Sequence, residues 1–299
     1  MLIYFIINPI AGKNQNVNRI ARLLDELNKR FPEANVLFTE KRGDAYKFGQ
    51  LLSDKQAKVV ICGGDGTINE VLNGLGAHSS PIVDIYPIGS GNDLARELKI
   101  SDNLDYLLNN LKIETFKLID LGEITLFDEK YTETKHLFGS SCGIGFDALA
   151  AHYSNQNSKF KGLLLYLSSV FRALRNYPSS QLSLSIDKHH LSTTSMMVSI
   201  GNGKTSGGGF KLLPKAKIDD GELDISIIKY INRIKILFYL PIAIFGKHTK
   251  LKIVNYFKFK NCEISLNPGN YVHTDGEVLS TDIKKISIRV LPATLKFRA

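Results

Sequence analysis

A carboxylate stands inside a glycine-rich turn at residues 63–67, a combination that favours phosphate chemistry. The apolar run Val59–Cys62 leads into Gly63-Gly64-Asp65-Gly66-Thr67, and a helical pattern starts at Ile68. Glycine lets the backbone come close to a ligand, and the free N–H groups at a helix start attract phosphate. An aspartate there suits a divalent cation placed between carboxylate and phosphate. A plain strand-to-helix turn is the alternative, but three glycines around one aspartate make phosphate binding the preferred interpretation.

Two other loops have the same design. The apolar run Ile82–Ile88 ends in Gly89-Ser90-Gly91-Asn92-Asp93, and the run Leu2–Ile7 ends in Asn8-Pro9-Ile10-Ala11-Gly12-Lys13. Helical patterns follow both loops. Ligands of parallel α/β sheets bind at the carboxyl ends of the strands, so we expect the three loops to contribute to one binding site.

Taken together, these segments resemble the diacylglycerol kinase catalytic family, which also includes sphingosine and ceramide kinases. Within it, the chain is most similar to the soluble bacterial diacylglycerol kinases and related lipid kinases. The similarity spans almost the whole chain, which is more specific than the Gly-Gly-Asp-Gly loop shared with NAD kinases and phosphofructokinases. One departure is Ser90, where many relatives have threonine, although the hydroxyl is kept. The matching segments are Asn8-Pro9, Gly12-Lys13, Thr39-Glu40, Gly43-Asp44-Ala45, Gly63–Thr67, Asn69-Glu70, Gly89–Arg96, Gly207–Gly209, Asp219–Gly221 and Asp275–Glu277.

This resemblance implies an ATP-dependent lipid kinase that converts diacylglycerol and ATP into phosphatidic acid and ADP. Asp65 and Asp93 would hold the catalytic Mg²⁺, partly through water. Glu277 would be the general base, because a lipid hydroxyl ionises far above neutral pH and a carboxylate must accept its proton. Its alternative is an exposed turn, since Asp-Gly favours turns. The residues implied to contact ATP are Asn8, Pro9, Ile10, Ala11, Gly12, Thr39, Gly64, Asp65, Gly66, Thr67, Ile68, Asn69, Glu70 and Ser90.

A separate acidic turn, Asp219-Asp220-Gly221-Glu222, has two interpretations. The resemblance to the bacterial relatives implies a structural Mg²⁺ bound by Asp220 and by the backbone carbonyls of Lys217 and Glu222. Without the resemblance, the segment has the composition of a surface turn.

Apolar runs alternate with helical patterns up to about Leu121, which predicts an α/β domain with a parallel sheet and helices on both faces. Arg19–Arg30 and Tyr46–Leu52 are its expected helices. The resemblance implies a NAD kinase/phosphofructokinase-like domain, here residues 1–121, to which a final strand within about 286–299 returns. Ile286–Leu291 and Thr294–Arg298 are the two candidates for that strand.

Residues 122–285 change to short β-like runs, which predict a C-terminal β-sandwich domain for the lipid substrate. An inserted helix is expected at Lys159–Arg175, and its apolar stripe is more typical of core than of a ligand site. The expected strands are Glu123–Leu126, His136–Ser141, Gln181–Ile186, Ser195–Ile200, Leu223–Lys229, Ile253–Phe259 and Glu263–Leu266.

Positive charge is concentrated in the second part of the chain. Residues 1–120 hold 14 Lys+Arg and 15 Asp+Glu, whereas residues 121–299 hold 24 and 14. From Lys229 to Lys260 there are eight basic residues and no acidic ones, and they flank the apolar run Ile236–Phe245. Basic flanks around an apolar surface suit an anionic membrane. A solvated basic face is the alternative, and no nucleic-acid recognition motif is visible.

The sequence also indicates in which cellular compartment the protein is expected. No apolar stretch approaches the roughly 20 residues that a membrane span needs. The three cysteines, Cys62, Cys142 and Cys262, are widely spaced, which favours a reducing cytosol without a disulfide framework or zinc site. We therefore expect a cytoplasmic protein that associates peripherally with the inner face of the membrane.

Two other functions remain open from the sequence. An NAD kinase-like phosphotransferase would share the nucleotide loop, but the Gly-Ser-Thr-Ala-Tyr-like segment expected of it does not occur. A non-catalytic lipid-binding or regulatory protein could use the same fold, although Asp65, Asp93 and Glu277 argue against it. We expect no nucleic-acid partner; a homodimer is possible, and the sequence does not identify the acceptor lipid.

Overall fold

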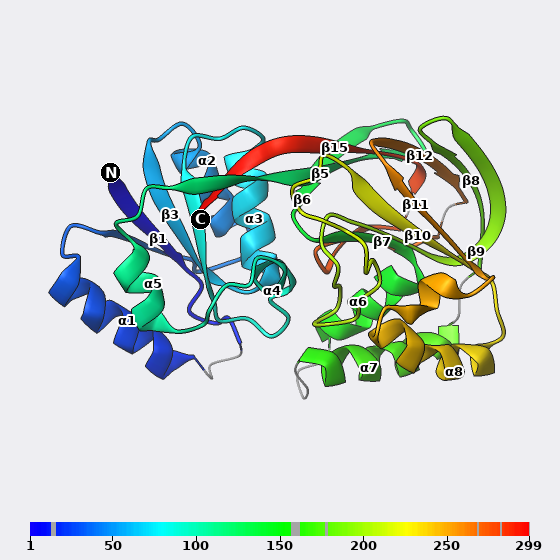
Figure 1. Ribbon diagram of the computed structural model, residues 1–299, viewed down its shortest axis with the longest axis horizontal. Helices are drawn as coiled ribbons and strands as arrows, with labels where there is room; N and C mark the ends of the chain where they lie inside the picture. Colours follow the sequence, from blue (N-terminus) through cyan, green and yellow to red (C-terminus); the bar gives the residue numbers. More distant parts are fainter. Residues whose placement is uncertain (13–15, 157–161, 177–178, 268, 282, 299) are drawn as a thin grey trace. The chain divides into compact units, whose positions relative to one another are not determined.

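The computed structural model describes residues 1–12, 16–156, 162–176, 179–267, 269–281 and 283–298, which form two compact units (Figure 1). Unit 1 consists of Met1–Ile119 and Ala293–Ala299, and unit 2 of Asp120–Pro292. The chain passes between the units in two long strands, β5 (Phe116–Asp128) and β15 (Ile283–Arg298).

Unit 1 is built on a parallel sheet in the order β15-β4-β3-β1-β2. The end of β15 enters this sheet through Lys296 and Phe297, which pair with Ile82 and Val83 of β4. The elements are β1 (Leu2–Ile7), α1 (Val17–Arg30), β2 (Asn35–Phe38), α2 (Asp44–Leu52), β3 (Ala57–Gly63), α3 (Asp65–Leu75), β4 (Ile82–Pro87), α4 (Asp93–Glu97) and α5 (Leu104–Asn110).

Burial explains why these residues form a covered parallel sheet. Strands β3 and β4 are buried at every position, as expected where helices cover both faces. Helix α1 presents Ile20, Leu23 and Leu27 at helical spacing. These side chains pack with Phe5 and Ile7 of β1 in one apolar cluster, to which α5 also contributes.

Unit 2 contains antiparallel strands around the branched strand β9, which pairs with β7, β8 and β10. Besides its parts of β5 and β15, its strands are β6 (Glu133–Phe138), β7 (Ser141–Gly145), β8 (Ser180–Ile186), β9 (His189–Gly201), β10 (Leu223–Lys229), β11 (Val254–Phe259), β12 (Asn261–Leu266), β13 (Val272–Thr274) and β14 (Glu277–Ser280). Its helices are α6 (Phe146–Gln156), α7 (Gly162–Ala173) and α8 (Arg233–Ile244), with short 3₁₀ turns at Leu174–Asn176 and Lys247–Lys250.

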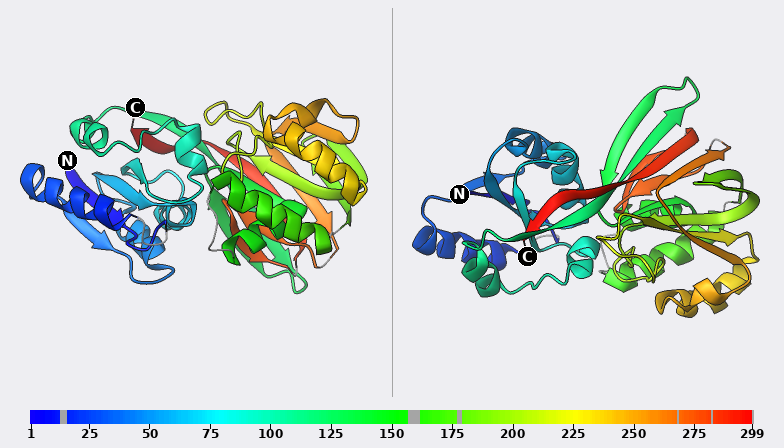
Figure 2. Two further views of the ribbon diagram at one scale, coloured as in Figure 1. Left: turned by 90° about the horizontal axis from the view of Figure 1, so that it is seen from below. Right: turned by 45° about the horizontal axis from the view of Figure 1, so that its top comes forward.

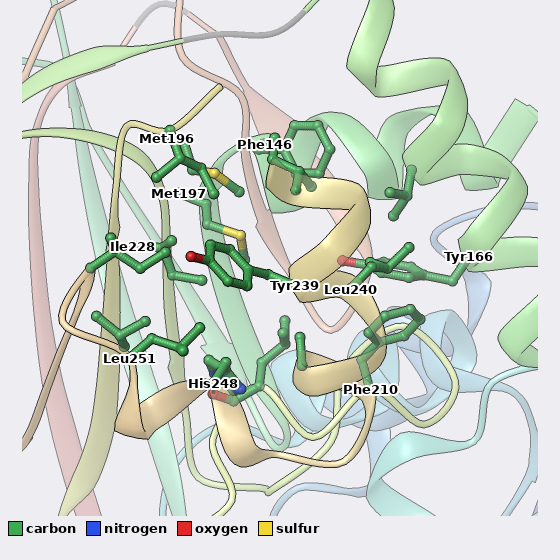
Figure 3. Close-up of a pocket in the computed structure, with 17 residues that line it drawn as sticks. Phe146, Tyr166, Met196, Met197, Phe210, Ile228, Tyr239, Leu240, His248 and Leu251 are labelled. Carbon is green, nitrogen blue, oxygen red and sulfur yellow. Dashed lines mark hydrogen bonds between the residues drawn. The ribbon is translucent and has the colours of Figure 1, made fainter. Parts of the chain in front are cut away.

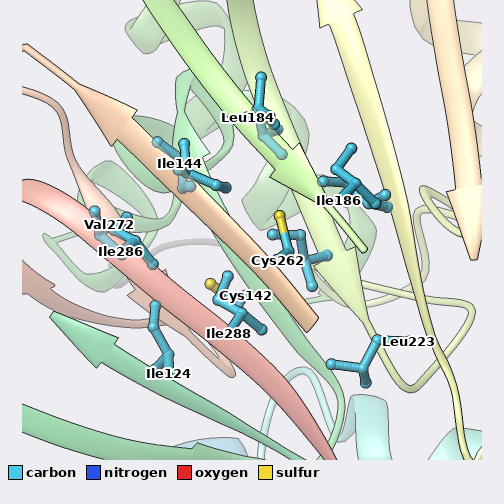
Figure 4. Packing of buried hydrophobic residues seen from close by; sticks show 14 of the residues in the cluster. Ile124, Cys142, Ile144, Leu184, Ile186, Leu223, Cys262, Val272, Ile286 and Ile288 are labelled. Carbon is cyan, nitrogen blue, oxygen red and sulfur yellow. The ribbon is translucent and has the colours of Figure 1, made fainter. Parts of the chain in front are cut away.

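The strands of unit 2 enclose an apolar core (Figure 4). Side chains from strands far apart in the sequence meet there, including Ile144, Leu184 and Ile286. Cys142 and Cys262 belong to this core and are free thiols. Burial raises the pKa of Cys262 to about 12, so its thiol is not poised for nucleophilic or redox chemistry.

Helices α6, α7 and α8 gather on one side of unit 2 (Figures 1 and 2). They form a second apolar cluster with Met196, Met197 and Phe210 from the strand and loop segments beneath them. None of the helices in the described ranges has both the length and the apolar character needed to cross a bilayer.

The α/β class with a second, β-sandwich-like unit confirms the predicted fold class. Several elements differ from the sequence expectation. The run His136–Ser141 is divided between β6 and β7, and β15 runs continuously through both candidates for the last strand. The expected helix at Lys159–Arg175 is observed as α7, while its first residues, 159–161, lie outside the described residues. Helices α6 and α8 were not predicted.

Candidate active site

Asp65 opens helix α3 directly after the buried strand β3. Its two carboxylate oxygens accept hydrogen bonds from the backbone N–H groups of Asn92 and Asp93, each at 2.7 Å. Both donors belong to the loop and helix start that follow β4. The carboxylate therefore ties two of the glycine-bearing loops together and brings Asp65 and Asp93 to the same edge of the sheet.

Close backbone contact explains the glycines of these two loops. A Cβ atom on Gly89 would lie 2.2 Å from the Cα of Gly64, and one on Gly91 would lie 2.4 Å from an oxygen of Asp65. Any side chain would push the loops apart, so both positions depend on the absence of a Cβ. The glycine pattern that predicted phosphate binding is thus also what lets the loops touch.

The loop after β1 joins the same edge through two asparagines. Asn8 donates its side-chain N–H to the hydroxyl of Thr67 at 2.9 Å, and its side-chain oxygen accepts the N–H of Ile10 at 3.1 Å. Asn16 donates to the carbonyl oxygens of Ala11 and Ile88 at 3.1 and 2.6 Å. Three strand ends therefore form one connected rim. Gly12 and Pro9 lie on this loop, whereas Lys13, which belongs to the matching segment Gly12-Lys13, lies outside the described residues.

The end of β2 is connected to this rim as well. Both carboxylate oxygens of Glu70 accept the backbone N–H of Gly43, at 3.0 Å each. Thr39 follows β2 and donates its backbone N–H to Ile7 at 2.9 Å. These two predicted ATP contacts thus also organise the backbone around the site.

The remaining predicted ATP contacts differ in exposure. Ile10 is 68 % exposed, and Gly66 and Ser90 are half-buried. Ile68 and Asn69 are buried, at 2 % and 8 % exposure. Because the side chain of Ile68 is buried, only its backbone is available for the predicted contact with ATP.

The donor set at Asp65 and Asp93 fits a magnesium ion that arrives with a nucleotide. Nowhere in the described ranges do three or more His, Cys, Asp or Glu side chains gather as a metal cluster. Mg²⁺ is commonly held by one or two carboxylates together with substrate phosphates and waters, and two aspartates are what this edge supplies. One oxygen of Asp93 also forms an ion pair with Arg96 at 2.6 Å, which keeps that carboxylate in place.

Glu277, the predicted base, lies in unit 2 at the start of β14 and is half-buried. It follows directly on the Asp275-Gly276 turn, which was the alternative interpretation of this segment. The carboxylate of Asp275 accepts the backbone N–H groups of Gly139, Ser140 and Ser141, each at 2.9 Å. The turn is therefore fixed against the neighbouring loop, which is what a residue with a positional role requires.

An apolar pocket lies between the helices and the sheet of unit 2 (Figure 3). Its cavity volume is about 60 Å³, well below the usual range for small-molecule sites. Its lining is apolar except for Tyr166, Tyr239 and His248. The other lining residues are Phe146, Val170, Met196, Met197, Phe210, Leu212, Ile228, Ile231, Ile236, Leu240, Ala243, Leu251, Ile253 and Val254.

His248 is the most buried polar group of this pocket, with 2 % of its surface exposed. Its Nε2 lies 3.1 Å from the carbonyl oxygen of Leu212, while its Nδ1 has no protein partner among the residues described. Burial lowers the pKa of His248, so the ring is neutral at pH 7. A neutral ring that donates from Nε2 leaves Nδ1 as an acceptor.

At the acidic turn Asp219–Glu222, a lysine side chain of the same chain provides the positive charge. The ammonium group of Lys258 lies 2.5, 3.6 and 3.5 Å from carboxylate oxygens of Asp220, Glu222 and Asp224. The carboxylate of Asp120 accepts the backbone N–H of Gly221 at 2.7 Å and fixes the turn from the other side. A divalent ion bound by Asp220 and the carbonyls of Lys217 and Glu222 would have to compete with this ammonium group.

Sequence reasoning passed over several residues with clear roles in these sites. Asp147 and His273 are both 1 % exposed and face each other in unit 2. Asn16 and Lys258 connect loops from a distance, and no local pattern marks them. A usable signal existed only for Asp147, because it follows the glycine-bearing segment Cys142–Gly145 in the first turn of α6.

Two family profiles match this chain, and together they cover most of it. Residues 2–124 match the diacylglycerol kinase catalytic domain, and residues 140–298 match the YegS C-terminal NAD kinase beta sandwich-like domain. The Bacillus subtilis protein named "Putative lipid kinase YtlR" is 29% identical, over 98% of this chain and 98% of that protein. A diacylglycerol kinase of Staphylococcus saprophyticus is 25% identical, over 91% and 87%.

Solved structures give the same fold. A diacylglycerol kinase structure from Bacillus anthracis is 23% identical and superposes with a TM-score of 0.73, over 99% of this chain and 96% of that chain. An NAD kinase from Archaeoglobus fulgidus in complex with ATP is 12% identical, with a TM-score of 0.54, over 100% and 94%. At these identities the two structures establish the fold and leave the chemistry to the site itself.

Proposed function

Because the chain belongs to the diacylglycerol kinase catalytic family, we propose that this lipid kinase transfers the γ-phosphoryl group of ATP to the hydroxyl of diacylglycerol, forming phosphatidic acid. The observation that carries the proposal is the rim of unit 1. There Asp65 and Asp93 meet on interlocked glycine loops at the carboxyl ends of parallel strands. Such an edge combines N–H groups for phosphate with carboxylates for Mg²⁺.

Each group has a defined task in the proposed reaction. The acceptor oxygen bonds to the γ-phosphorus, the bond from that phosphorus to the β–γ bridging oxygen breaks, and ADP leaves. Backbone N–H groups at the start of α3 bind phosphate oxygens. Asp65 and Asp93 would hold Mg²⁺, which offsets the charge of the phosphates. The carboxylate of Glu277 accepts the proton of the acceptor hydroxyl.

The pocket of unit 2 supports a lipid as acceptor. An acyl chain has no polar atoms to satisfy, so a nearly unbroken apolar lining suits it. NAD, the acceptor of the alternative phosphotransferase, carries charged phosphates and hydroxyls that this lining would leave unpaired. The pocket therefore favours the lipid kinase over the NAD kinase alternative.

The exposed side of helix α8 supports the proposal that the enzyme acts at a membrane surface. Ile236 and Leu240 line the pocket on its inner side, whereas Ile234 and Phe238 are 63 % and 73 % exposed. Basic residues precede and follow the exposed apolar side chains, and Lys229–Lys260 contains no acidic residue. Exposed apolar residues between lysines and arginines suit an anionic lipid surface. We propose peripheral binding to the inner face of the cytoplasmic membrane through α8.

The direct test is transfer of labelled phosphate from γ-labelled ATP to a panel of acceptors. The panel contains diacylglycerol, monoacylglycerol, sphingosine, ceramide, undecaprenol and NAD, each with Mg²⁺. We expect the label in phosphatidic acid; label in NADP would establish the NAD kinase alternative. Lipid binding without any transfer would establish the non-catalytic alternative.

Two variants test the assigned roles in the same assay. Asp65→Asn is expected to lose activity while ATP still binds weakly, because it removes a carboxylate charge that would hold Mg²⁺. Glu277→Gln is expected to lower kcat by about 10²–10⁴-fold with nearly unchanged ATP affinity, because Glu277 acts on the acceptor. Near-normal turnover of Glu277→Gln in saturating lipid would refute its role as base.

A further inference from the structure

The hairpin that carries Glu277 has a tight two-residue turn. Thr274 and Glu277 are paired residues of β13 and β14, and Asp275 and Gly276 connect them. Both turn residues have positive φ, 48° and 85°, as expected for a turn that suits a β-hairpin. Because Glu277 is the first residue after the turn, its position follows directly from how the turn is held.

The turn is held at both of its residues. Asp275 accepts backbone N–H groups of the loop between β6 and β7, as described above. Gly276 donates its backbone N–H to Nδ1 of His273 at 3.2 Å, and its carbonyl oxygen accepts the side-chain N–H of Asn155 at 3.0 Å. His273 therefore controls the turn residue that lies next to Glu277.

Gly276 and Asp147 together fix which nitrogen of the His273 ring carries the proton. A backbone N–H can only donate, so Nδ1 of His273 must accept, and the ring proton is on Nε2. Nε2 lies 3.4 Å from a carboxylate oxygen of Asp147. Both side chains are 1 % exposed, and a Cβ on Gly143 would lie 2.3 Å from Nε2, so the pair needs a glycine beside it.

Further hydrogen bonds stabilise the charged form of the buried Asp147 carboxylate. Asp147 accepts the hydroxyl of Tyr166 at 2.5 Å and that of Ser199 at 3.1 Å. Burial by itself would raise the pKa of Asp147, but the bonds from His273, Tyr166 and Ser199 hold it below its usual value. The carboxylate is thus charged at neutral pH and keeps His273 oriented.

Tyr166 connects the same carboxylate to the apolar pocket. Its ring lines the pocket and packs on Phe210 with the ring centres 4.5 Å apart (Figure 3). Its hydroxyl donates to Asp147. A continuous line of contacts therefore runs from the pocket wall through Tyr166, Asp147 and His273 to Gly276.

We propose that His273 is a positioning residue for Glu277, oriented by Asp147, and that Tyr166 extends this line to the wall of the lipid pocket. The inference rests on the function proposed above, in which Glu277 accepts the proton of the acceptor. His273 does not touch the reacting atoms; it sets the turn from which Glu277 projects. Its loss lowers kcat and leaves ATP binding intact.

Two substitutions of His273 separate its two bonds. His273→Asn places an amide oxygen near the position of Nδ1 and retains an acceptor for Gly276. His273→Gln reaches toward Asp147 but offers no acceptor at the Nδ1 position. We expect His273→Gln to lower kcat by about tenfold to a hundredfold, as misplacement of a catalytic group by about 1 Å does. His273→Asn should retain most of kcat, and the KM for ATP should stay unchanged in both variants.

Amide hydrogen exchange provides a readout that does not depend on activity. The Gly276 N–H should exchange faster in His273→Gln than in His273→Asn or the wild type. Ser195→Ala is a matched control, because Ser195 is a buried serine of β9 that bonds to Met197 and Ile228 and not to this line. It should lower stability without changing kcat or exchange at Gly276.

The outcomes distinguish this inference from the proposed function. If Glu277→Gln keeps its turnover, the assignment of the base fails. If Glu277→Gln loses turnover but both His273 variants keep it, the positioning inference alone is refuted. Equal losses of kcat in the two His273 variants, in proportion to their losses of stability, would reduce His273 to a role in folding.

Discussion

Replacing Lys258 by methionine tests whether the chain supplies its own cation at the acidic turn. Methionine keeps most of the apolar stem and removes the ammonium group that faces Asp220, Glu222 and Asp224. The side chain of Asp224 is fully buried, whereas Asp220 and Lys258 are 22 % and 34 % exposed. The variant therefore leaves one buried and two partly solvated carboxylates without their counter-ion.

The expected loss lies between two limits. Removing one partner of a fully buried ion pair costs about 3–5 kcal/mol, and an exposed pair contributes about 0.2–1 kcal/mol. Because Lys258 is one-third exposed, we expect Lys258→Met to lower the free energy of unfolding by about 1–3 kcal/mol, the usual cost of an unsatisfied buried group.

Magnesium separates the two interpretations of the turn. If Lys258 already neutralises the acidic turn, Mg²⁺ should not bind there in the wild type. Binding at this turn should then not change the wild type's free energy of unfolding. Mg²⁺ should stabilise Lys258→Met by about 1.4 kcal/mol at ten times its dissociation constant. The assay is urea unfolding of the full chain without nucleotide, with and without MgCl₂ at constant ionic strength. A magnesium-dependent gain in the wild type that Asp220→Ala abolishes would refute this reasoning and establish the structural ion predicted from the sequence.

Three further predictions address other parts of the chain. Arg298→Met should cost about 3–5 kcal/mol in urea unfolding, since it leaves the fully buried Asp84 without its ion-pair partner; a loss below 1 kcal/mol would contradict this. Burial lowers the pKa of His248 below 6.5, so its contribution to stability is complete above that pH and is lost as the pH falls below it. His248→Gln should therefore show a smaller loss of stability between pH 7.5 and 5.5 than the wild type, and an equal loss would refute the assignment. Phe238→Ser should weaken binding to phosphatidylglycerol vesicles by about tenfold to a hundredfold, because inserting this side chain contributes about 1.5–3 kcal/mol; unchanged binding in a sedimentation assay would exclude α8 as the docking surface.

The rim of unit 1, which we propose binds the nucleotide, could be predicted from the sequence because its requirements are local. Each loop must turn within a few residues and let another backbone approach, which only glycine permits at Gly64 and Gly89. The buried strands before them have continuous apolar runs, and such runs are readable without any partner. Local chemistry thus located Asp65 and Asp93, and the structure then showed how their backbones interlock.

The interactions of His273 and Lys258 could not be predicted from the sequence, because their partners are remote in the sequence. His273 and Asp147 are 126 residues apart, and Lys258 and Asp220 are 38 apart. A single histidine or lysine has no periodicity or spacing that identifies its partner. Only the fold brings these groups together, and for Asp147 and His273 burial then makes the pairing obligatory.

Helix α8 was missed for a different reason, which bears on its function. Sequence periodicity finds a helix when one side is apolar and the other polar, but Ile236 faces the pocket while Phe238 is exposed. Pro241 inside the helix weakens the pattern further. A surface helix normally carries polar side chains on the side that faces solvent. Sequences depart from such local rules most often at functional sites. In the proposed function, the absence of helical periodicity in residues 233–244 has a direct explanation: the side of α8 with Ile236 would face the acyl chain, and the side with Phe238 would face the membrane.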